Sequence, residues 1–455
     1  MKTSSVVKIL MPALAALVAC QAGFAQAAYA VVPTAAPGHF RPYVWRMNTP
    51  IRPNFGVYGP AYCNTNAFYS FTFCPRGLQS VYGANSIPSG NGGRGKTIAI
   101  VDAFHYAHAA SDLATFNTAM GLPQLDGVGT DPTLTIVGCT DVSGAPPTPP
   151  SYGVTCASPS TGTSNPGWEV EEMLDLEYAH AMAPYANILM VEAYDNGGSL
   201  FGAVYYAESN ADIVSNSWGG AESAGQTSAD TTFGQGKPIL FSSGDTGDEV
   251  CIAFNGDGSC KTYAVGVQYP CSSPNVTCVG GTTLLPSGSP LRRSSEVAWS
   301  GSGGGCSTQE GLPYYQNIGA IGGGGAPSVC NSGGSWRAVP DIAAVADPST
   351  GVMEYDSGNG GYFQVGGTSL ATPVTAGLFA QIIAARHTFG QATIPYFNPA
   401  LYPAAIRNYP YFFFDIVSGS NGYPAGTGYD LVTGLGVSNI AAMANRFFGL
   451  IFVLD

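Results

Sequence analysis

Five continuously apolar runs separated by helical patterns constrain the fold of this chain more than any other feature of its sequence. The runs are residues 96–102, 186–194, 211–218, 237–245 and 276–284. Between them, residues 167–183 and 200–210 have the apolar spacing of helices. Continuous apolar strands that alternate with helices are typical of a parallel sheet covered on both faces. We therefore expect an α/β fold with a doubly wound, mostly parallel sheet and helices on both faces.

Three polar residues lie near the carboxyl ends of these expected strands. They are Asp102, Ser217 and Asp245. Because ligands of such sheets bind at the carboxyl ends of the strands, we expect the functional site at this edge. Two Gly-, Pro- and Ser-rich stretches, residues 139–166 and 300–335, are expected to be surface loops.

The charge of the chain excludes one class of partner and favours one environment. Of its 455 residues, 16 are basic and 29 acidic, which gives a formal net charge of −13. A nucleic-acid partner is not expected, because its phosphates need basic side chains. Only 10% of the residues are charged, so few native salt bridges would be lost in an acidic medium.

The N-terminus has the pattern of an export signal. An apolar run over residues 9–19 follows two lysines, and a small-residue cleavage site stands at 25–27. We therefore expect a signal peptide over residues 1–27 and a secreted protein without an integral membrane segment. Residues 17–20 also resemble the box before a lipidated cysteine in bacterial lipoproteins, so a lipid anchor at Cys20 is the alternative.

The cysteines agree with export. Beyond Cys20, the remaining ten form five sequential couples, and an even count in an exported chain favours disulfides. No couple has the two-residue gap of a zinc site. We expect neighbours to pair, as Cys63/Cys74, Cys139/Cys156, Cys251/Cys260, Cys271/Cys278 and Cys306/Cys330.

Ser369 stands where a strand pattern meets a helical one. Residues 362–365 have a strand pattern, Gly-Gly-Thr precedes the serine, and residues 370–386 have a helical pattern. Unpaired N–H groups at a helix N-terminus favour developing negative charge, and the glycines allow a sharp turn and a close approach of substrate backbone. A lone serine in this position is more often only a helix cap, so further residues must support a nucleophile.

A serine nucleophile needs a base, and histidine is the usual one. None of the five histidines lies in a His-Gly-Thr context of the subtilisin type, and we expect them to be ordinary surface or supporting residues. A subtilisin-type enzyme that uses one of them stays an alternative. They are His39, His105, His108, His180 and His387.

The acidic helix over residues 167–183 offers a different base. Glu171 and Asp175 are four residues apart and share one face. If they are partly buried, they would share a proton, so that one is a competent base below neutral pH while the other orients it. The alternative is a solvated acidic face, which the remaining acids of the helix would fit: Glu169, Glu172 and Glu177.

Two further pieces complete the pattern. Asp245 follows a buried strand and stands between glycines. A carboxylic acid kept neutral there could donate to an oxyanion, whereas the alternative is a turn aspartate that binds its own backbone. Near the C-terminus, Asp415 and Asp430 with intervening loop carbonyls would form a hard oxygen cage for Ca²⁺.

These pieces, in this order, resemble the sedolisins (serine-carboxyl peptidases) from about residue 82 to about residue 444. The resemblance implies a subtilisin-like fold, with Ser369 as nucleophile, Glu171 as base, Asp175 as supporting acid and Asp245 as oxyanion acid. Asp102 matches an acid that extends the carboxylate network, and residues 217–220 match the substrate-cleft strand. One structural Ca²⁺ would be held by these groups: the Asp415 and Asp430 side chains and the Ile416, Gly426 and Gly428 carbonyls.

The resemblance implies an endopeptidase that cleaves polypeptides at acidic pH, and we expect it to be a secreted monomer. We divide the chain into a signal peptide (1–27), an N-terminal arm (28–75) and a peptidase domain with the calcium site (76–455). The arm is shorter than the usual pro-domain of the family, so inhibition by a pro-segment does not follow from the resemblance. The same motifs would also fit a tripeptidyl aminopeptidase on this scaffold or a catalytically inactive binding protein.

Overall fold

The computed structural model describes most of the chain. The described residues are 29–31, 40–47, 68–69, 72–87, 91–141, 149, 152–158, 160–255, 259–287, 292–330 and 335–446. The expected signal peptide, Cys20, His39 and Cys63 lie outside these residues, so the predictions made for them are not tested.

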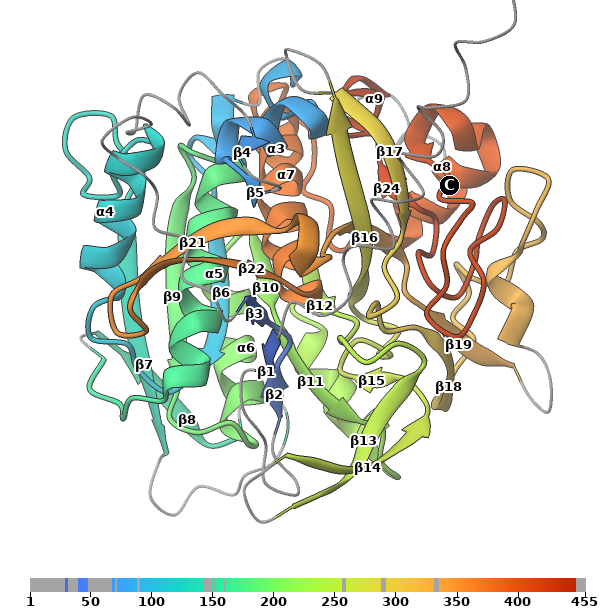
Figure 1. Ribbon diagram of the computed structural model, residues 1–455, viewed down its shortest axis with the longest axis horizontal. Helices are drawn as coiled ribbons and strands as arrows, with labels where there is room; N and C mark the ends of the chain where they lie inside the picture. The colour runs from blue at the N-terminus through green and yellow to red at the C-terminus, as the bar shows by residue number, and fades with distance from the viewer. Residues whose placement is uncertain are drawn as a thin grey trace, which may run out of the picture.

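A large, mostly parallel sheet forms the centre of the protein (Figure 1). Its path is β23 (Phe413–Phe414), β24 (Val437–Ser438), β20 (Ile342–Val345), β16 (Thr277–Ser287), β12 (Ile239–Ser242), β10 (Ile213–Asn216), β6 (Thr97–Ala103), β9 (Asn187–Ala193), β7 (Leu134–Asp141) and β8 (Val154–Ala157), and β17 (Arg292–Ala298) pairs with β16. All pairings from β24 to β7 are parallel, and those of β8, β17 and β23 are antiparallel. The expected mostly parallel sheet is confirmed, and the five apolar runs form β6, β9, β10, β12 and β16.

Helices cover both faces of this sheet, as expected. The α-helices are α3 (Pro75–Tyr82), α4 (Ala109–Met120), α5 (Pro166–Met182), α6 (Ser199–Asn210), α7 (Thr368–Thr388), α8 (Asn398–Phe412) and α9 (Ile440–Arg446); the 3₁₀ turns are η1 (Ala84–Ser86), η2 (Asn91–Gly93), η3 (Gln226–Phe233), η4 (Pro327–Cys330) and η5 (Pro348–Thr350). Successive side chains of a strand point to opposite faces. In β6, Ile98 and Ile100 join the core that holds α4, α5 and α7, whereas Ala99 and Val101 join the core on the α6 side.

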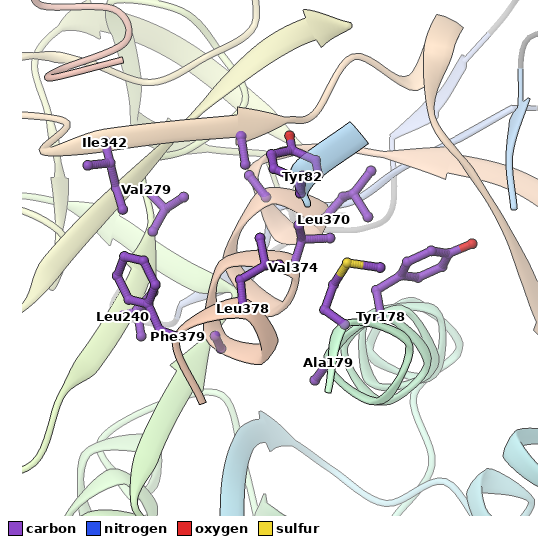
Figure 2. Packing of buried hydrophobic residues seen from close by; sticks show 14 of the residues in the cluster. Tyr82, Tyr178, Ala179, Leu240, Val279, Ile342, Leu370, Val374, Leu378 and Phe379 are labelled. Carbon is purple, nitrogen blue, oxygen red and sulfur yellow. The ribbon is translucent and has the colours of Figure 1, made fainter. Parts of the chain in front are cut away.

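Helix α7, which carries Ser369, is a core helix. Its side chains pack between sheet residues such as Leu240 and the α5 residue Tyr178 (Figure 2). A Cβ on Gly377 would lie 2.6 Å from the Cβ of Met182, so glycine permits the close approach of α7 to α5. By length and composition α7 could cross a membrane, but its most apolar window is 100% buried inside the protein.

Two smaller sheets bring the N-terminal arm to the body of the protein. One has the order β1 (Tyr29–Val31), β3 (Trp45–Met47), β22 (Gly361–Gly366), β21 (Val352–Asp356), β5 (Thr72–Phe73) and β4 (Phe68–Tyr69). The other has the order β15 (Gln268–Tyr269), β11 (Trp218–Ala221) and β2 (Arg41–Pro42). The described parts of the arm are therefore paired with strands of the peptidase region. The boundary between residues 75 and 76, in the first turn of α3, stays a prediction.

Four of the five expected disulfides are confirmed. Two of them lie in residues 139–166 and 300–335, the stretches that were expected to be surface loops. The four bridges join Cys139 to Cys156, Cys251 to Cys260, Cys271 to Cys278 and Cys306 to Cys330. The loop prediction was wrong where these cysteines lie on paired strands. Cys139 and Cys156 are partners in the β7–β8 hairpin, and Cys306 lies on β18 (Gly305–Gly311), which pairs with β19 (Trp336–Val339). The Cys251–Cys260 bridge lies in a further hairpin, formed by β13 (Glu249–Phe254) and β14 (Cys260–Val265).

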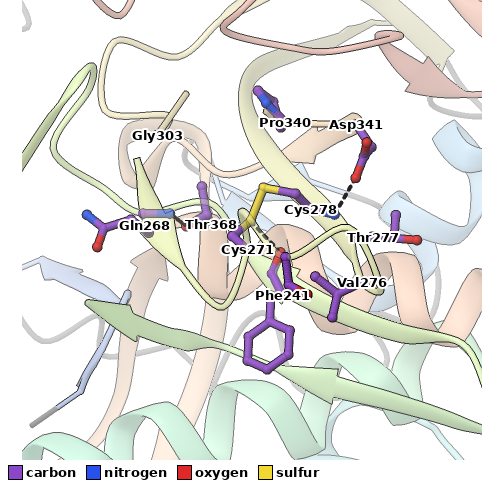
Figure 3. Close-up of a disulfide and its surroundings, with 12 residues drawn as sticks. Phe241, Gln268, Cys271, Val276, Thr277, Cys278, Gly303, Pro340, Asp341 and Thr368 are labelled. Carbon is purple, nitrogen blue, oxygen red and sulfur yellow. Dashed lines mark hydrogen bonds between the residues drawn. A yellow bond between two sulfur atoms is a disulfide. The ribbon is translucent and has the colours of Figure 1, made fainter. Parts of the chain in front are cut away.

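A buried ion pair stands beside the Cys271–Cys278 bridge. The Asp341 carboxylate accepts from the Cys278 backbone N–H at 2.8 Å, as Figure 3 shows. It also accepts from both terminal nitrogens of Arg337, at 2.9 and 2.6 Å, and both side chains are fully buried. This bidentate ion pair fixes the segment that leads into β20. Figure 3 also shows Gln268 and Thr368 in the surroundings of the disulfide.

Candidate active site

Ser369 lies at the N-terminus of α7, as predicted. The helix begins at Thr368, and the preceding Gly367 has φ 116°, a conformation that residues with a Cβ rarely adopt. Pro373 lacks an N–H, so the Ser369 carbonyl has no helical partner from that residue. The Ser217 hydroxyl lies 3.4 Å from this carbonyl oxygen instead. The sharp turn at Gly367 thus places the Ser369 hydroxyl at the end of the helix, beside β10.

Ser217 connects the serine to the acidic helix. The Ser369 hydroxyl donates to the Ser217 carbonyl at 3.2 Å, and the Ser217 hydroxyl donates to Asp175 Oδ1 at 2.8 Å. Glu171 is fully buried, and neither of its oxygens makes a well-aligned hydrogen bond with the described residues. Ser369 is nonetheless near enough to lower the pKa of Glu171 as a hydrogen-bond partner. The glutamate thus lies beside the serine without a well-aligned bond to it.

Burial and like charge raise the pKa of both acids of the helix. For Glu171 the largest cause is desolvation, followed by the charges of Asp175 and Asp102. For Asp175 it is again desolvation, followed by Asp102, while the bond from Ser217 lowers the pKa. Two buried carboxyls this close cannot both ionise cheaply, so the pair holds a proton above the usual pKa of either acid.

Asp245 lies on the other side of the serine, at the end of β12. Its Oδ1 accepts from the backbone N–H and from the hydroxyl of Thr368, both at 2.8 Å. Its Oδ2 has no hydrogen-bond partner among the described residues and lies 2.6 Å from the place of a Cβ on Gly367. Burial raises the pKa of Asp245 to about 8, although the two bonds from Thr368 and the charge of Arg41 lower it. A neutral Asp245 can therefore carry its proton on Oδ2 and donate a hydrogen bond to a group bound beside Ser369.

A third group of carboxyls extends the pair away from the serine. Asp102, at the end of β6, is fully buried, and desolvation and the charge of Glu192 raise its pKa. Desolvation raises the pKa of Glu192 as well, and one of its oxygens lies 2.8 Å from His105 Nδ1. Asp102, which the resemblance added to the carboxylate network, thus interacts electrostatically with Glu192 on one side and with Glu171 and Asp175 on the other.

The solvated acidic face considered for the helix is not present. Glu169, Glu172 and Glu177 are buried, with exposures of 8%, 1% and 0%. Glu169 accepts a hydrogen bond from Ser164, and Glu177 accepts one from the Tyr355 N–H of β21 at 3.2 Å. The expectation failed because the β21–β22 hairpin packs against α5, which periodicity within the helix cannot reveal.

The described histidines do not serve the serine. None of His105, His108, His180 and His387 forms a hydrogen bond with Ser369 in the described part of the chain. His180 is fully buried rather than a surface residue, and burial lowers its pKa to about 4. Among the described residues, Glu171 rather than a histidine is thus the hydrogen-bond partner that Ser369 has as a possible base.

A segment of the N-terminal arm lies across the site. Strand β2 pairs antiparallel with β11, with Pro42 opposite Trp218 and Arg41 opposite Gly219. The next residue, Tyr43, donates its N–H to the Ser217 carbonyl and to Ser369 Oγ, both at 3.1 Å. Its carbonyl oxygen accepts from the Ser369 N–H at 3.1 Å.

The same carbonyl oxygen also lies beside Asp245. A Cβ added to Gly367 would lie 2.1 Å from this carbonyl oxygen and 2.6 Å from Asp245 Oδ2, so both oxygens lie beside Gly367. The Ser369 N–H thus donates to an oxygen that lies near Asp245, and these two groups are the kind of donors that form an oxyanion hole.

The side chain of Tyr43 fills a pocket that sequence reasoning missed. Its hydroxyl donates to Gln268 Oε1 at 2.7 Å, and the residue is 2% exposed. A Cβ on Gly219 would lie 2.6 Å from this hydroxyl oxygen, so only glycine there leaves room for the ring. No motif around residue 43 marks this role, because the contact joins segments 225 residues apart.

The residues proposed for calcium gather in a separate loop region. Asp415 accepts from the Gly428 N–H at 3.2 Å, and Asp430 Oδ2 accepts from the Gly426 N–H at 3.0 Å. Both carboxylates thus meet the segment 426–428, while Ile416 directly follows Asp415. Asp430 Oδ1 already accepts three hydrogen bonds from Val432 and Thr433, and Asp415 Oδ1 accepts two, from Tyr409 and Gly428. The Oδ2 oxygen of each carboxylate accepts one bond, which leaves a lone pair unused. The donor set is of the hard oxygen type that Ca²⁺ prefers.

Comparison with known proteins gives a consistent result. The model of the subtilase family matches residues 153–405. Kumamolisin from Bacillus sp. (strain MN-32) is 30% identical over 380 residues, which are 78% of this chain and 60% of kumamolisin. Sedolisin from Pseudomonas sp. (strain 101) is 36% identical over 230 residues, which are 47% of this chain and 35% of sedolisin. The chain spans less than two thirds of the length of both relatives.

Among solved structures, that of Pseudomonas sedolisin, a serine-carboxyl proteinase complexed with two molecules of pseudo-iodotyrostatin, resembles this one. The superposition has a TM-score of 0.64 and 27% sequence identity. It covers 82% of this chain and 97% of the other. The likeness therefore extends over most of the chain.

Proposed function

The chain belongs to the subtilase family, in its sedolisin group, and from this premise we propose that it is a serine-carboxyl endopeptidase active on polypeptides at acidic pH. The subtilisin-like fold expected from the sequence is confirmed. One observation carries the proposal: a peptide carbonyl oxygen, that of Tyr43, accepts a hydrogen bond from the Ser369 N–H and lies near Asp245. A site that receives a peptide in this manner fits acyl transfer.

In the proposed mechanism, Glu171 takes the proton of the Ser369 hydroxyl while Ser369 Oγ attacks the scissile carbonyl carbon. Asp175, which Ser217 orients, supports Glu171. The Ser369 N–H and the protonated Asp245 donate to the oxyanion. The proton on Glu171 then passes to the departing amine, and water resolves the acyl-enzyme by the same steps in reverse order.

An upper pH limit to activity follows from the state of Asp245. This group can donate only while it carries its proton, and burial keeps its pKa raised, at about 8, in the covered site. Glu171 must instead lose its proton to act as base, and its burial beside Asp175 also raises its pKa. Activity therefore requires a window in which one acid is protonated and the other is not.

The position of Phe40 favours endopeptidase over tripeptidyl-peptidase activity. Counted back from Tyr43, Phe40 is the fourth residue on the acyl side. Its N–H donates to the Asn196 carbonyl at 2.7 Å, and its carbonyl accepts from Asn196 Nδ2 at 2.9 Å. A cleft that makes two hydrogen bonds to a fourth residue has no stop after the third. The intact serine, acid pair and Asp245 likewise argue against an inactive binding protein.

Binding of one structural Ca²⁺ is part of the proposal. Asp415 and Asp430 would supply carboxylates, and Ile416, Gly426 and Gly428 would supply carbonyls. Convergence of both carboxylates on residues 426–428 supports this assignment. A bound divalent cation would neutralise the two charges and tie the loop to the body of the protein.

Secretion after removal of residues 1–27, with action as a monomer, is also proposed. Four disulfides among the described residues support an oxidising, extracellular location. Mass determination of the exported protein distinguishes cleavage after residue 27 from a lipid anchor at Cys20, because a lipid adds the mass of its acyl chains.

The test of the proposed activity is hydrolysis of a denatured protein from pH 2 to pH 8. Wild type is compared with Ser369→Ala, Glu171→Gln and Glu177→Gln. The last is a matched control, because Glu177 is a buried acid of the same helix, bonded to Tyr355 rather than placed beside Ser369. We expect an optimum on the acid side, internal peptides as products, and loss of activity only in the Ser369 and Glu171 variants. Tripeptides alone, or wild-type activity unaffected by Glu171→Gln, would contradict the proposal.

A further inference from the structure

Two buried acids lie side by side at the edge of the sheet, next to the acid pair of α5. Asp102 in β6 is directly opposite Glu192 in β9, because the two strands pair in parallel in that register. On each strand, the residues two and four positions earlier join the core that holds α5, so both carboxyls point toward this helix. Their exposures are only 0% and 1%. Like charges directly opposite each other on a sheet repel, so both acids can be ionised together only at a high cost.

His105 joins this buried pair to the surface of the protein. Its Nδ1 lies 3.0 and 2.8 Å from the two carboxylate oxygens of Glu192. The Glu192 side chain is 1% exposed, whereas that of His105 is 21% exposed. An imidazole in an acidic medium carries a positive charge. His105 can therefore supply the counter-charge that a buried carboxylate at Glu192 needs.

The backbone that presents His105 is strained. Phe104 has φ 72°, a conformation that is a genuine outlier for a bulky residue. Its N–H donates to the Ala193 carbonyl at 2.7 Å, and the His105 N–H donates to the Thr163 carbonyl at 2.8 Å. A Cβ on Gly162 would lie 3.0 Å from the His105 Cβ. The turn after β6 is thus held on both sides, and strain that the surroundings maintain is typical of functional positions.

The carboxyls around Glu192 favour a negative charge on Glu192 itself. Desolvation raises the pKa of Glu192, but a hydrogen bond from Ser160 and the charge of His105 lower it. Glu172 of α5 is a further hydrogen-bond partner, and this bond lowers the pKa of Glu192 while it raises that of Glu172. For both Glu172 and Asp102, desolvation is the largest cause of a raised pKa, and the charge of Glu192 comes next. Glu172 and Asp102 therefore keep their protons while Glu192 is ionised.

The protonation state of Asp102 matters for the acid pair. An ionised Asp102 raises the pKa of Glu171, after desolvation and the charge of Asp175, and it also raises the pKa of Asp175. A neutral Asp102 lacks this effect, so Glu171 can lose its proton at a lower pH. The titratable groups that face these carboxyls are Glu169, Glu171, Glu172 and Asp175 of α5, Asp102, His105, Glu192, Asp245, Glu354 of β21 and Tyr43. His105 is the cationic member of this set.

We propose that His105 is a positioning residue of the reaction, which holds the negative charge of the carboxyl network on Glu192 and thereby keeps Asp102 neutral beside the base. The inference rests on the proposed function, in which Glu171 is that base. His105 does not contact Ser369 and acts only through Glu192. Without the imidazolium, Glu192 gains a proton, Asp102 loses the neighbour that keeps it neutral, and Glu171 is deprotonated only at higher pH.

The test is the acidic limb of kcat/KM for an internally quenched peptide, measured from pH 2 to pH 6. In His105→Gln the limb should move up by at least about 0.5 pH unit, because the counter-charge is lost. His105→Lys keeps a cation for Glu192 and should restore the limb to within about 0.2 unit of the wild type. His108→Gln is the matched control, since His108 lies three residues further on and is not among the groups that face the network. It should leave the limb in place.

A double-mutant cycle with Glu192→Gln shows whether His105 acts through Glu192. Glu192→Gln alone should move the limb up, because the charge passes to Asp102, and adding His105→Gln should then move it less than half as far as in the wild-type background. If His105→Gln does not fold, the single Glu192→Gln variant decides, and an unmoved limb would overturn the inference.

Three other results would overturn the inference and leave the proposed function intact. They are a limb that His105→Gln leaves in place, a limb that His105→Lys moves as far as His105→Gln does, and equal shifts by His105→Gln in both backgrounds. A wild type without an acidic limb, or full activity in Glu171→Gln, would instead overturn the inference together with the proposed function.

Discussion

Replacing Asp245 by asparagine should leave the oxyanion site with a donor that no longer depends on pH. Asp245 Oδ1 accepts two hydrogen bonds from Thr368, both at 2.8 Å, so this oxygen must stay an acceptor. In Asp245→Asn the amide oxygen would take that place and the NH₂ group would point where Oδ2 now lies. The amide would thus donate in the direction that the protonated acid uses.

The expected magnitudes come from the role of a single donor. Asp245→Ala removes the donor and should lower kcat by about 10²- to 10³-fold, the usual cost of losing one oxyanion-hole group. Asp245→Asn should keep at least about ten times the activity of the alanine variant. In the wild type, deprotonation of Asp245 should lower kcat/KM about tenfold per pH unit on the alkaline side, because one proton is lost.

The assay is kcat/KM for an internally quenched peptide from pH 3 to pH 9, measured for wild type and both variants. We expect the alkaline limb to move up by at least one pH unit or to disappear in Asp245→Asn. An asparagine variant as inactive as the alanine variant, or one with the wild-type alkaline limb, would refute the assignment of Asp245 as a protonated donor.

Three further results are expected. The melting temperature should fall as pH rises from 4 to 8. The raised pKa values of Glu171, Asp175 and Asp102 keep protons on the folded protein that the unfolded chain releases above about pH 4. A melting temperature that rises over this range would contradict the buried carboxyl network. Asp341→Ala should cost about 3–5 kcal/mol of unfolding free energy in urea titrations, since it leaves the buried Arg337 charge unpaired, and a cost below about 1 kcal/mol would argue against the pair. Chelation of calcium should lower the melting temperature, and an unchanged value would exclude a structural ion at residues 415–430.

Local patterns were sufficient to predict the sheet and the position of the serine. A buried parallel strand is apolar at every position, so residues 96–102 and 237–245 could be recognised without knowledge of their neighbours. A turn of glycines between strand and helix likewise located Ser369 at the start of α7. These features depend on residues close in sequence, which explains the agreement.

Features that depend on distant contacts escaped prediction. The burial of Glu177 depends on Tyr355 in β21, and nothing within the helix signals that contact. For the arm at residues 28–75 the sequence predicted no contact with the active site, yet Tyr43 contacts Ser369 and Gln268, which are hundreds of residues away in the chain. Its role follows from the geometry of the cleft rather than from any local composition.

The central claim is that a carboxylate rather than a histidine activates Ser369. The most direct measurement is the rate of acyl-enzyme formation at the acid optimum, followed by mass spectrometry on rapidly quenched samples of Glu171→Gln and His105→Gln beside the wild type. The account predicts a loss of at least about 10²-fold in Glu171→Gln and less than about tenfold in His105→Gln. Acylation at the wild-type rate in Glu171→Gln, with loss in the histidine variant, would contradict it.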